Sequence, residues 1–166
     1  MTADRWLPAY VGLGSNLDEP VAQVRRALAA LEGLPKTRLV ARSSLYRSPP
    51  MGPPDQPDYV NAVAALLTGL PAAELLAALQ GIEDAQGRRR DGPRWGPRTL
   101  DLDLLLYGEL AVNSDTLVLP HPGLAERPFV LVPLLEVAPG LRVPGGSRVA
   151  QLATRVGGGE LGRLDG

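Results

Sequence analysis

The sequence of 166 residues contains no cysteine, one histidine (His121) and, among 17 basic residues, one lysine (Lys36). The absence of cysteine excludes disulfides, thiol nucleophiles and cysteine-ligated zinc or iron–sulfur sites. A single histidine also excludes a zinc site with two histidine ligands, and a Schiff-base or phosphate-binding lysine could only be Lys36. Any metal ion would therefore be held mainly by oxygen, and most cationic chemistry would come from arginine.

The chain also lacks a strong excess of charge, since 17 basic residues face 18 acidic ones and the net charge is −1. No global positive field attracts nucleic acid or an anionic membrane. The N-terminal residues lack the basic and apolar segments of a secretory signal, and no run of about 18 apolar residues occurs. We expect a cytoplasmic protein without a nucleic-acid or membrane partner.

Glycine (19 residues) and proline (17 residues) are abundant, yet the apolar fraction is 45%. This composition favours a folded core with long, rigid loops over disorder. The length predicts a single domain over residues 1–166. We expect its core over about residues 6–140, followed by a glycine-rich, partly irregular extension over residues 141–166.

Apolar periodicity and turn residues predict six main elements in the order strand, helix, strand, strand, helix, strand. The expected strands cover residues 6–13, 37–48, 59–67 and 100–107, and the expected helices cover residues 21–31 and the segment that begins near residue 71. Residues 117–119 are expected to be extended, and residues 129–137 are expected to form a short buried helix or strand.

This order predicts an α+β fold of the ferredoxin-like split βαβ class (βαββαβ). Two helices would cover one face of an antiparallel sheet and leave the other face for loops and ligands. The segment 59–67 is apolar on both faces and is expected in the centre of the sheet. Gly12 and Gly14 are interpreted as a tight turn from strand to helix.

The last strand of this core contains the sequence Asp101-Leu102-Asp103. Side chains two residues apart in a strand share a face, so both carboxylates project together while Leu102 points the other way. Two adjacent like charges repel unless a cation lies between them, and Mg²⁺ bound to phosphate oxygens fits this chain best. The alternative is a solvated pair on an edge strand.

An arginine-rich loop directly precedes this strand. It contains Arg88, Arg89, Arg90, Arg94 and Arg98 among glycines and prolines. Guanidinium groups match phosphate oxygens two at a time and neutralise developing charge. Beside a dicarboxylate metal site, such a loop indicates phosphoryl-type transfer, although by itself it could be a solvated basic loop.

Tyr59 and Asn61 form another pair on one face of a strand, where a ring and a carboxamide could stack on and hydrogen-bond a flat heterocycle. Tyr59 could equally be a core tyrosine, and Phe129 and Trp95 have the same ambiguity. His121 lies between two prolines, where it could bind phosphate or brace a turn.

The sequence resembles the 6-hydroxymethyl-7,8-dihydropterin pyrophosphokinase family over about residues 9–140. The resemblance rests on Arg98-Thr99-Leu100-Asp101-Leu102-Asp103 preceded by Arg94-Trp95-Gly96-Pro97, together with Gly14-Ser15-Asn16-Leu17, Ser48-Pro49-Pro50-Met51-Gly52, the segment 55–61, Pro120-His121-Pro122 and Arg127-Pro128-Phe129. Several motifs in the same order and at similar spacing are more specific than any one of them.

The resemblance implies transfer of pyrophosphate from ATP to the pterin hydroxymethyl oxygen, giving AMP and the pterin diphosphate, in folate biosynthesis. ATP and two Mg²⁺ ions would be required. We expect a monomer whose substrates are small molecules.

The resemblance also implies a set of site residues. Asp101 and Asp103 would ligate the metal ions, and Arg88 and Arg98 would stabilise the moving phosphates. The residues that would bind ATP are Gln80, Arg88, Arg90, Trp95, Arg98, Leu104, His121 and Arg127. The residues that would bind the pterin are Ser48, Pro49, Pro50, Met51, Tyr59, Asn61, Trp95, Asp101 and Phe129. Asp101 is also the candidate general base. Thr116, Val118 and Pro122 depart from the family pattern and bear on the contacts with ATP.

Two other functions fit parts of the sequence. A Mg²⁺-dependent nucleotidyltransferase also uses Asp-x-Asp, but Gly14-Ser15 is over eighty residues from the aspartates. A non-catalytic ferredoxin-like module that binds RNA would need aromatic residues on its sheet, and the chain has one phenylalanine.

Overall fold

The computed structural model describes residues 6–16, 19–49, 57–86, 100–157 and 161–164. In chain order the elements are β1 Leu7–Ser15, α1 Pro20–Glu32, β2 Thr37–Arg42, β3 Tyr46–Ser48, β4 Tyr59–Thr68, α2 Ala72–Ala85, β5 Asp101–Tyr107, β6 Val112–Asn113, β7 Val118–Leu119, the short 3-10 helix η1 Leu124–Glu126, α3 Pro128–Val137, α4 Val149–Val156 and β8 Gly162–Arg163. The mixed α+β class with an antiparallel sheet is therefore confirmed.

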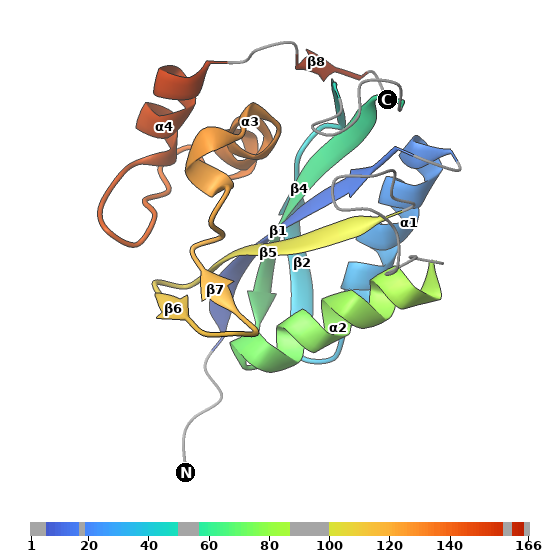
Figure 1. Ribbon diagram of the computed structural model, residues 1–166. Helices are drawn as coiled ribbons and strands as arrows, with labels where there is room; N and C mark the ends of the chain where they lie inside the picture. Colours follow the sequence, from blue (N-terminus) through green and yellow to red (C-terminus); the bar gives the residue numbers. More distant parts are fainter. Residues whose placement is uncertain (1–5, 17–18, 50–56, 87–99, 158–160, 165–166) are drawn as a thin grey trace.

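The main sheet has the strand order β5-β1-β4-β3-β8, and β2 pairs with β4 beside β3. All these pairs are antiparallel. The strand β4 lies in the centre, as its apolar residues on both faces predict, and β5 is at an end of the strand order (Figure 1).

Each face of the sheet carries its own hydrophobic core. On one face, α1 and α2 pack on the sheet in a first core that includes Leu28, Leu66 and Leu79. On the other face, α3 and α4 form a second core that includes Val63 and Leu131. The two helix pairs lie on opposite sides of the sheet in Figure 1. The expectation that helices cover one face alone was wrong, because the apolar residues of α3 and α4 also need a surface to pack on.

The segment 37–48 is not one strand but two, β2 and β3. Ser43, between them, bonds Val63 of β4 twice, because its N–H donates to the Val63 carbonyl and its hydroxyl accepts from the Val63 N–H, both at 2.9 Å. The next N–H, of Ser44, donates to the Glu136 carboxylate at 3.0 Å. Side-chain groups thus replace hydrogen bonds that a continuous β-strand would make through its backbone, and the strand is interrupted here.

One other expectation differs from the structure. Gly12 and Gly14 lie inside β1 and pair with Val63 and Asn61 of β4, so they do not form a turn. Within the C-terminal extension, Val149 and Leu152 of α4 are buried and β8 pairs with β3. None of the helices in the described part of the chain has the length and apolar character to span a bilayer.

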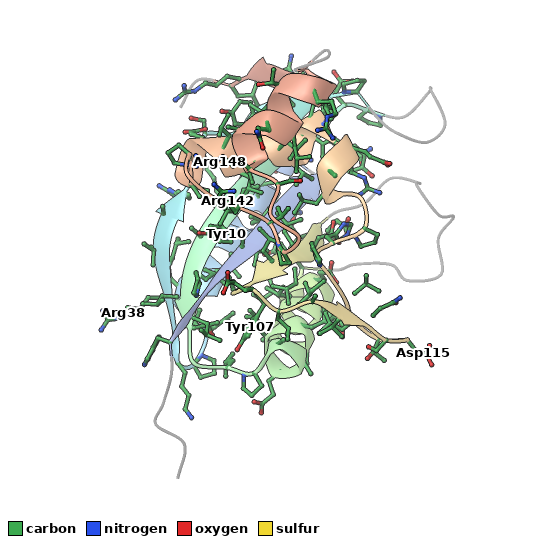
Figure 2. The ribbon with its side chains drawn as sticks, turned by 90° about the vertical axis from the view of Figure 1, so that its left-hand side faces the viewer. Tyr10, Arg38, Tyr107, Asp115, Arg142 and Arg148 are labelled. Carbon is green, nitrogen blue, oxygen red and sulfur yellow. The ribbon has the colours of Figure 1, made fainter. Side chains whose placement is uncertain are left out.

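A β-bulge in β5 gives this strand two alternation patterns. Leu104 pairs with Val11 and Leu106 pairs with Tyr10, so Leu105 between them has no counterpart in β1. Leu104 and Tyr107 consequently belong to the first core, whereas Leu105 and Leu106 belong to the second. In Figure 2, Tyr107 lies beside α2, and Tyr10 lies farther up the sheet towards α3 and α4.

Candidate active site

Asp101 and Asp103 lie at the start of β5, opposite Gly14 and Gly12 of β1. The side chain of Leu102, between them, is buried in the first core. Asp103 is 36% exposed, and Asp101 is half-buried. The two carboxylates therefore project from the other face of the sheet, as the alternation of the sequence predicts.

A cross-strand row connects Asp101 through Gly14 to Asn61 of β4. Because neighbouring strands are about 4.8 Å apart, the backbones of Asp101 and Asn61 are roughly 10 Å apart. A Cβ atom on Gly14 would lie 3.2 Å from Asn61 Nδ2 and 3.7 Å from Tyr59 Cδ1. Glycine at this position thus lets the Asn61 and Tyr59 side chains pack down on β1.

The orientation of the Asn61 carboxamide is set by Ser48 of β3. The Ser48 hydroxyl donates a hydrogen bond of 2.6 Å to Asn61 Oδ1, and both side chains are buried. The Nδ2 group of Asn61 accordingly lies on the side of Gly14. Tyr59, the residue opposite Ser48, is half-buried on the same face. Ser48, Tyr59 and Asn61 are therefore brought together, as the predicted pterin-binding set requires.

His121 lies beside Asp103, with Nε2 at 3.7 Å from Asp103 Oδ1. Its backbone N–H donates to the carbonyl of Leu105, the extra residue of the bulge, at 3.0 Å. Its Nδ1 accepts a hydrogen bond from the Gly123 N–H at 3.1 Å. Because Nδ1 is an acceptor, the neutral imidazole carries its proton on Nε2 and presents a donor towards Asp103.

Arg127 and Phe129 lie at the start of α3, and Arg127 contacts Gly123 in the turn after His121. The Arg127 guanidinium packs over Gly123 so closely that a Cβ atom there would be 2.4 Å from Arg127 Cζ. The same Cζ lies 5.9 Å from the centroid of the Phe129 ring, in cation–π geometry. His121, Gly123, Arg127 and Phe129 thus form one contiguous group.

The aspartate pair fits the ligand chemistry of Mg²⁺. The described residues contain no group of three or more His, Cys, Asp or Glu side chains that could hold a metal ion. Mg²⁺ is commonly bound by one or two carboxylates together with substrate phosphates and water. Two carboxylates on one face of β5 supply the protein part of such a site.

The other predicted site residues fall into two groups. Gln80 is exposed on α2, Pro49 is exposed after β3, and the Leu104 side chain is buried in the first core, so Leu104 could reach a ligand only through its backbone. The remaining positions lie outside the described residues and are Pro50, Met51, Arg88, Arg90, Trp95 and Arg98.

The sequence analysis missed two carboxylates that accept hydrogen bonds from distant residues. Glu83 of α2 is 2% exposed, and its Oε2 accepts a hydrogen bond of 2.7 Å from the N–H of Leu102. Glu136 is the one charged residue in the apolar segment 129–137. Glu83 lies four residues after Leu79, on the apolar stripe of its helix. In both cases an acidic residue occupies a position in an apolar pattern, and this signal could have identified Glu83 and Glu136.

Glu136 joins α3 to the segment around β3. Tyr46 Oη donates to Glu136 Oε1 at 2.6 Å, the Ser44 hydroxyl donates to Oε2 at 2.9 Å, and Arg163 of β8 lies 4.0 Å away. Burial by itself would raise the pKa of Glu136, but the hydrogen bonds from Tyr46 and Ser44 outweigh it and lower this pKa. Burial and the adjacent carboxylate raise the pKa of Tyr46 to about 12.

The sequence is similar to one known protein family and to individual proteins that bear its name. A sequence model of the family "7,8-dihydro-6-hydroxymethylpterin-pyrophosphokinase (HPPK)" matches residues 10–139. The 2-amino-4-hydroxy-6-hydroxymethyldihydropteridine pyrophosphokinase of Pseudomonas aeruginosa is 57% identical over 143 residues, which cover 86% of this chain and 88% of that protein. The protein of the same name from Haemophilus influenzae is 50% identical over 88% of this chain and 91% of its own length.

Solved structures show a similar fold. A crystal structure of Plasmodium falciparum HPPK-DHPS superposes on 92% of this chain with a TM-score of 0.74 at 14% identity, and a second, of the wild type with pteroate, has a TM-score of 0.72 at 11% identity. The chain spans 44% and 43% of these longer proteins, so the likeness concerns the fold of that part. With the family match over residues 10–139, the chain belongs to the 7,8-dihydro-6-hydroxymethylpterin-pyrophosphokinase family.

Proposed function

We propose that this chain transfers the terminal pyrophosphoryl group of ATP to the hydroxymethyl oxygen of 6-hydroxymethyl-7,8-dihydropterin, with AMP and the pterin diphosphate as products, in folate biosynthesis. The observation that carries the proposal is the family match over residues 10–139, with the motif aspartates together on one face of β5. In this reaction the hydroxymethyl oxygen attacks the β-phosphorus of ATP, and the bond from that phosphorus to the α–β bridging oxygen breaks.

Asp101 and Asp103 are proposed to hold Mg²⁺ on the triphosphate, with two ions bound. The ions would neutralise phosphate charge and align the reacting groups. His121 presents its Nε2 proton beside Asp103, at 3.7 Å, and so can donate to a phosphate oxygen of the bound nucleotide. Arg127, in the same group, adds a positive charge, and we place Gln80 and the backbone of Leu104 at the nucleotide.

Tyr59, Asn61, Ser48 and Phe129 are proposed to bind the pterin. The carboxamide orientation fixed by Ser48 supports this role, because it directs an N–H donor of Asn61 towards β1. The row through Gly14 connects Asn61 with Asp101, so a pterin beside Asn61 could extend its hydroxymethyl group towards the triphosphate. Asp101 is our candidate for the group that accepts the hydroxyl proton.

Seven further assignments rest on the family resemblance alone. Arg88 and Arg98 are proposed to stabilise the transferred phosphates, Arg90 to bind ATP, Trp95 to contact both substrates, and Pro49, Pro50 and Met51 to border the pterin.

The architecture supports further proposals. We propose that the core belongs to the ferredoxin-like split βαβ class, which the order β5-β1-β4, with β2 and β3 beyond β4 and with α1 and α2 on one face, supports. We propose that residues 1–166 form one domain, active as a cytoplasmic monomer without nucleic acid.

The experiment that tests the function is an assay with Mg²⁺, ATP and 6-hydroxymethyl-7,8-dihydropterin, with products identified by phosphorus NMR. AMP and the pterin diphosphate are expected. Release of inorganic pyrophosphate would instead indicate nucleotidyl transfer and would refute the proposal. Salt-dependent RNA binding without turnover of ATP would favour the RNA-binding alternative.

The Asp103→Asn variant tests the metal assignment. It should abolish turnover, while thermal stability stays unchanged or rises because a repulsive like-charge pair is relieved. The matched control is Asp115→Asn, at an exposed position between β6 and β7 that is labelled in Figure 2. Activity of Asp103→Asn close to that of the control would contradict the assignment.

A further inference from the structure

Glu83 is a buried carboxylate that the reaction described above does not use. It lies in the last turn of α2 and is 2% exposed. A carboxylate is costly to bury unless hydrogen bonds replace its lost water. Its Oε2 accepts a buried hydrogen bond of 2.7 Å from the backbone N–H of Leu102. The interaction therefore connects α2 to the short segment between the two motif aspartates.

The position of this N–H explains why the bond matters. In an antiparallel pair, successive residues of a strand direct their backbone groups alternately to the partner strand and away from it. Leu102 pairs in register with Leu13 of β1, but its N–H is directed to Glu83. In the described sheet β5 pairs with β1 alone, so α2 supplies the acceptor on the other edge of the strand.

Glu83 and the two aspartates lie on different sides of β5. The Leu102 side chain points into the first core with α2, whereas Asp101 and Asp103 project from the opposite face. Glu83 therefore holds the peptide between Asp101 and Leu102 from the side of α2. A peptide plane held at its N–H cannot rotate freely, and this restricts ψ of Asp101 and φ of Leu102, the backbone angles on either side of that peptide in the segment that joins the two aspartates.

We propose that Glu83 is a positioning residue for the metal-binding aspartates, since its hydrogen bond to the Leu102 N–H sets the geometry in which Asp101 and Asp103 meet Mg²⁺ and ATP. This inference rests on the proposed function of the aspartates. Loss of partners that orient metal ligands typically lowers metal affinity or activity by about 10–100-fold. A displacement of about 1 Å in a catalytic group has an effect of similar size.

The test compares Glu83→Met, which keeps the volume of the side chain but has no carboxylate acceptor, with Glu83→Gln, which keeps an acceptor oxygen at the same length. For Glu83→Met we expect kcat to fall by roughly 10–100-fold and the Mg²⁺ concentration for half-maximal rate to rise. For Glu83→Gln we expect kcat within about threefold of the wild type, because the Leu102 N–H retains an acceptor.

Leu79→Ala is the matched control for a purely structural effect, because Leu79 is fully buried one turn earlier in the same helix. This variant should lower the melting temperature at least as much as Glu83→Met, yet keep the Mg²⁺ dependence of the wild type. If Glu83→Met does not fold, Glu83→Asp replaces it, since it keeps the charge but withdraws the carboxylate by one methylene. The same direction of change in kcat and Mg²⁺ dependence is then expected.

Binding of Mn²⁺ in the presence of a non-hydrolysable ATP analogue, measured by electron paramagnetic resonance, separates this inference from the proposed function. A wild-type protein without turnover would overturn the function, whereas the Mn²⁺ affinities would still test Glu83. Weaker Mn²⁺ binding in Glu83→Met than in Leu79→Ala supports the positioning role. Equal Mn²⁺ affinity, or equal kcat and Mg²⁺ dependence, in folded Glu83→Met and the wild type overturns it.

Discussion

Replacement of Glu136 by alanine should loosen the attachment of α3 to the segment around β3. The carboxylate accepts hydrogen bonds from the Tyr46 hydroxyl, the Ser44 N–H and the Ser44 hydroxyl. Alanine removes all three acceptor positions at once. The Tyr46 hydroxyl is the group most affected, because Tyr46 is 7% exposed and has little access to water as a substitute partner.

The size of the effect follows from the burial of each bond. The partly buried bond from Tyr46 to a charged acceptor contributes about 1.5–2 kcal/mol, and each exposed bond from Ser44 contributes about 0.5 kcal/mol. The Arg163 guanidinium is 67% exposed at 4.0 Å and adds little. We therefore expect Glu136→Ala to lower the free energy of unfolding by about 2.5–3 kcal/mol, or the melting temperature by about 5–10 °C.

The pH dependence of this effect has a definite sign. The pKa of Glu136 is lower in the folded protein than its ordinary value of 4.5. The contribution of Glu136 to the free energy of unfolding is therefore complete above pH 4.5 and is lost as pH falls through the folded pKa. The pKa of Tyr46 is raised to about 12, so its contribution is complete below its ordinary value of 10 and is lost as pH rises towards 12. The stability difference between wild type and variant should shrink at both extremes.

Thermal unfolding followed by circular dichroism at several pH values measures the stability. Tyrosinate absorbance measures the titration of Tyr46. The Tyr46→Phe variant serves as the reference, because burial also raises the pKa values of Tyr10 and Tyr107. In Glu136→Ala the pKa of Tyr46 should move from about 12 towards 10. The control is Glu109→Ala, at an exposed position after β5. A melting temperature of Glu136→Ala equal to that of Glu109→Ala, or a stability difference independent of pH, would refute the reasoning.

Two further predictions concern the substrate side of the sheet. Gly14→Ala places a Cβ atom 3.2 Å from Asn61 Nδ2, so the carboxamide must shift. Steady-state kinetics should show roughly a tenfold rise in KM for the pterin, with KM for ATP nearly unchanged. Equal changes in both KM values would argue against a pterin role for Asn61. His121→Ala removes the Nε2 donor beside Asp103, and kcat/KM for ATP should fall roughly tenfold; an unchanged value would limit His121 to bracing the turn.

The alternation of β5 was predictable because its signal is local. Asp101 and Asp103 alternate with Leu100, Leu102 and Leu104, and a period of two is enough to place carboxylates and leucines on different faces. The stripes of α1 and α2 and the apolar β4 were predictable for the same reason. The family motifs added residues that no periodicity can identify, such as His121 and Arg127.

The features that were missed depend on partners far away in the sequence. The break between β2 and β3 involves Ser44 and Glu136, which are 92 residues apart, so no local window contains its cause. The bond from Leu102 to Glu83 spans 19 residues and joins a helix to a strand edge. The helix α4 is short, with 8 residues, and the glycines around it dilute its apolar pattern. The sequence thus predicted a buried helix or strand at residues 129–137, where α3 lies, but not α4 or the packing of both helices on the second face of the sheet.

The extra residue of the bulge makes a change in the length of β5 more damaging than a change in the length of a surface loop. Deletion of Leu105 would restore uniform alternation from Asp101 to Tyr107. Each remaining residue could then keep its partner in β1 and its present face, but the second core would lose the fully buried Leu105 side chain. The deletion would also remove the carbonyl that holds His121. Homologous chains should therefore tolerate insertions and deletions in the surface loops but keep the number of residues between the second aspartate and the end of this strand constant.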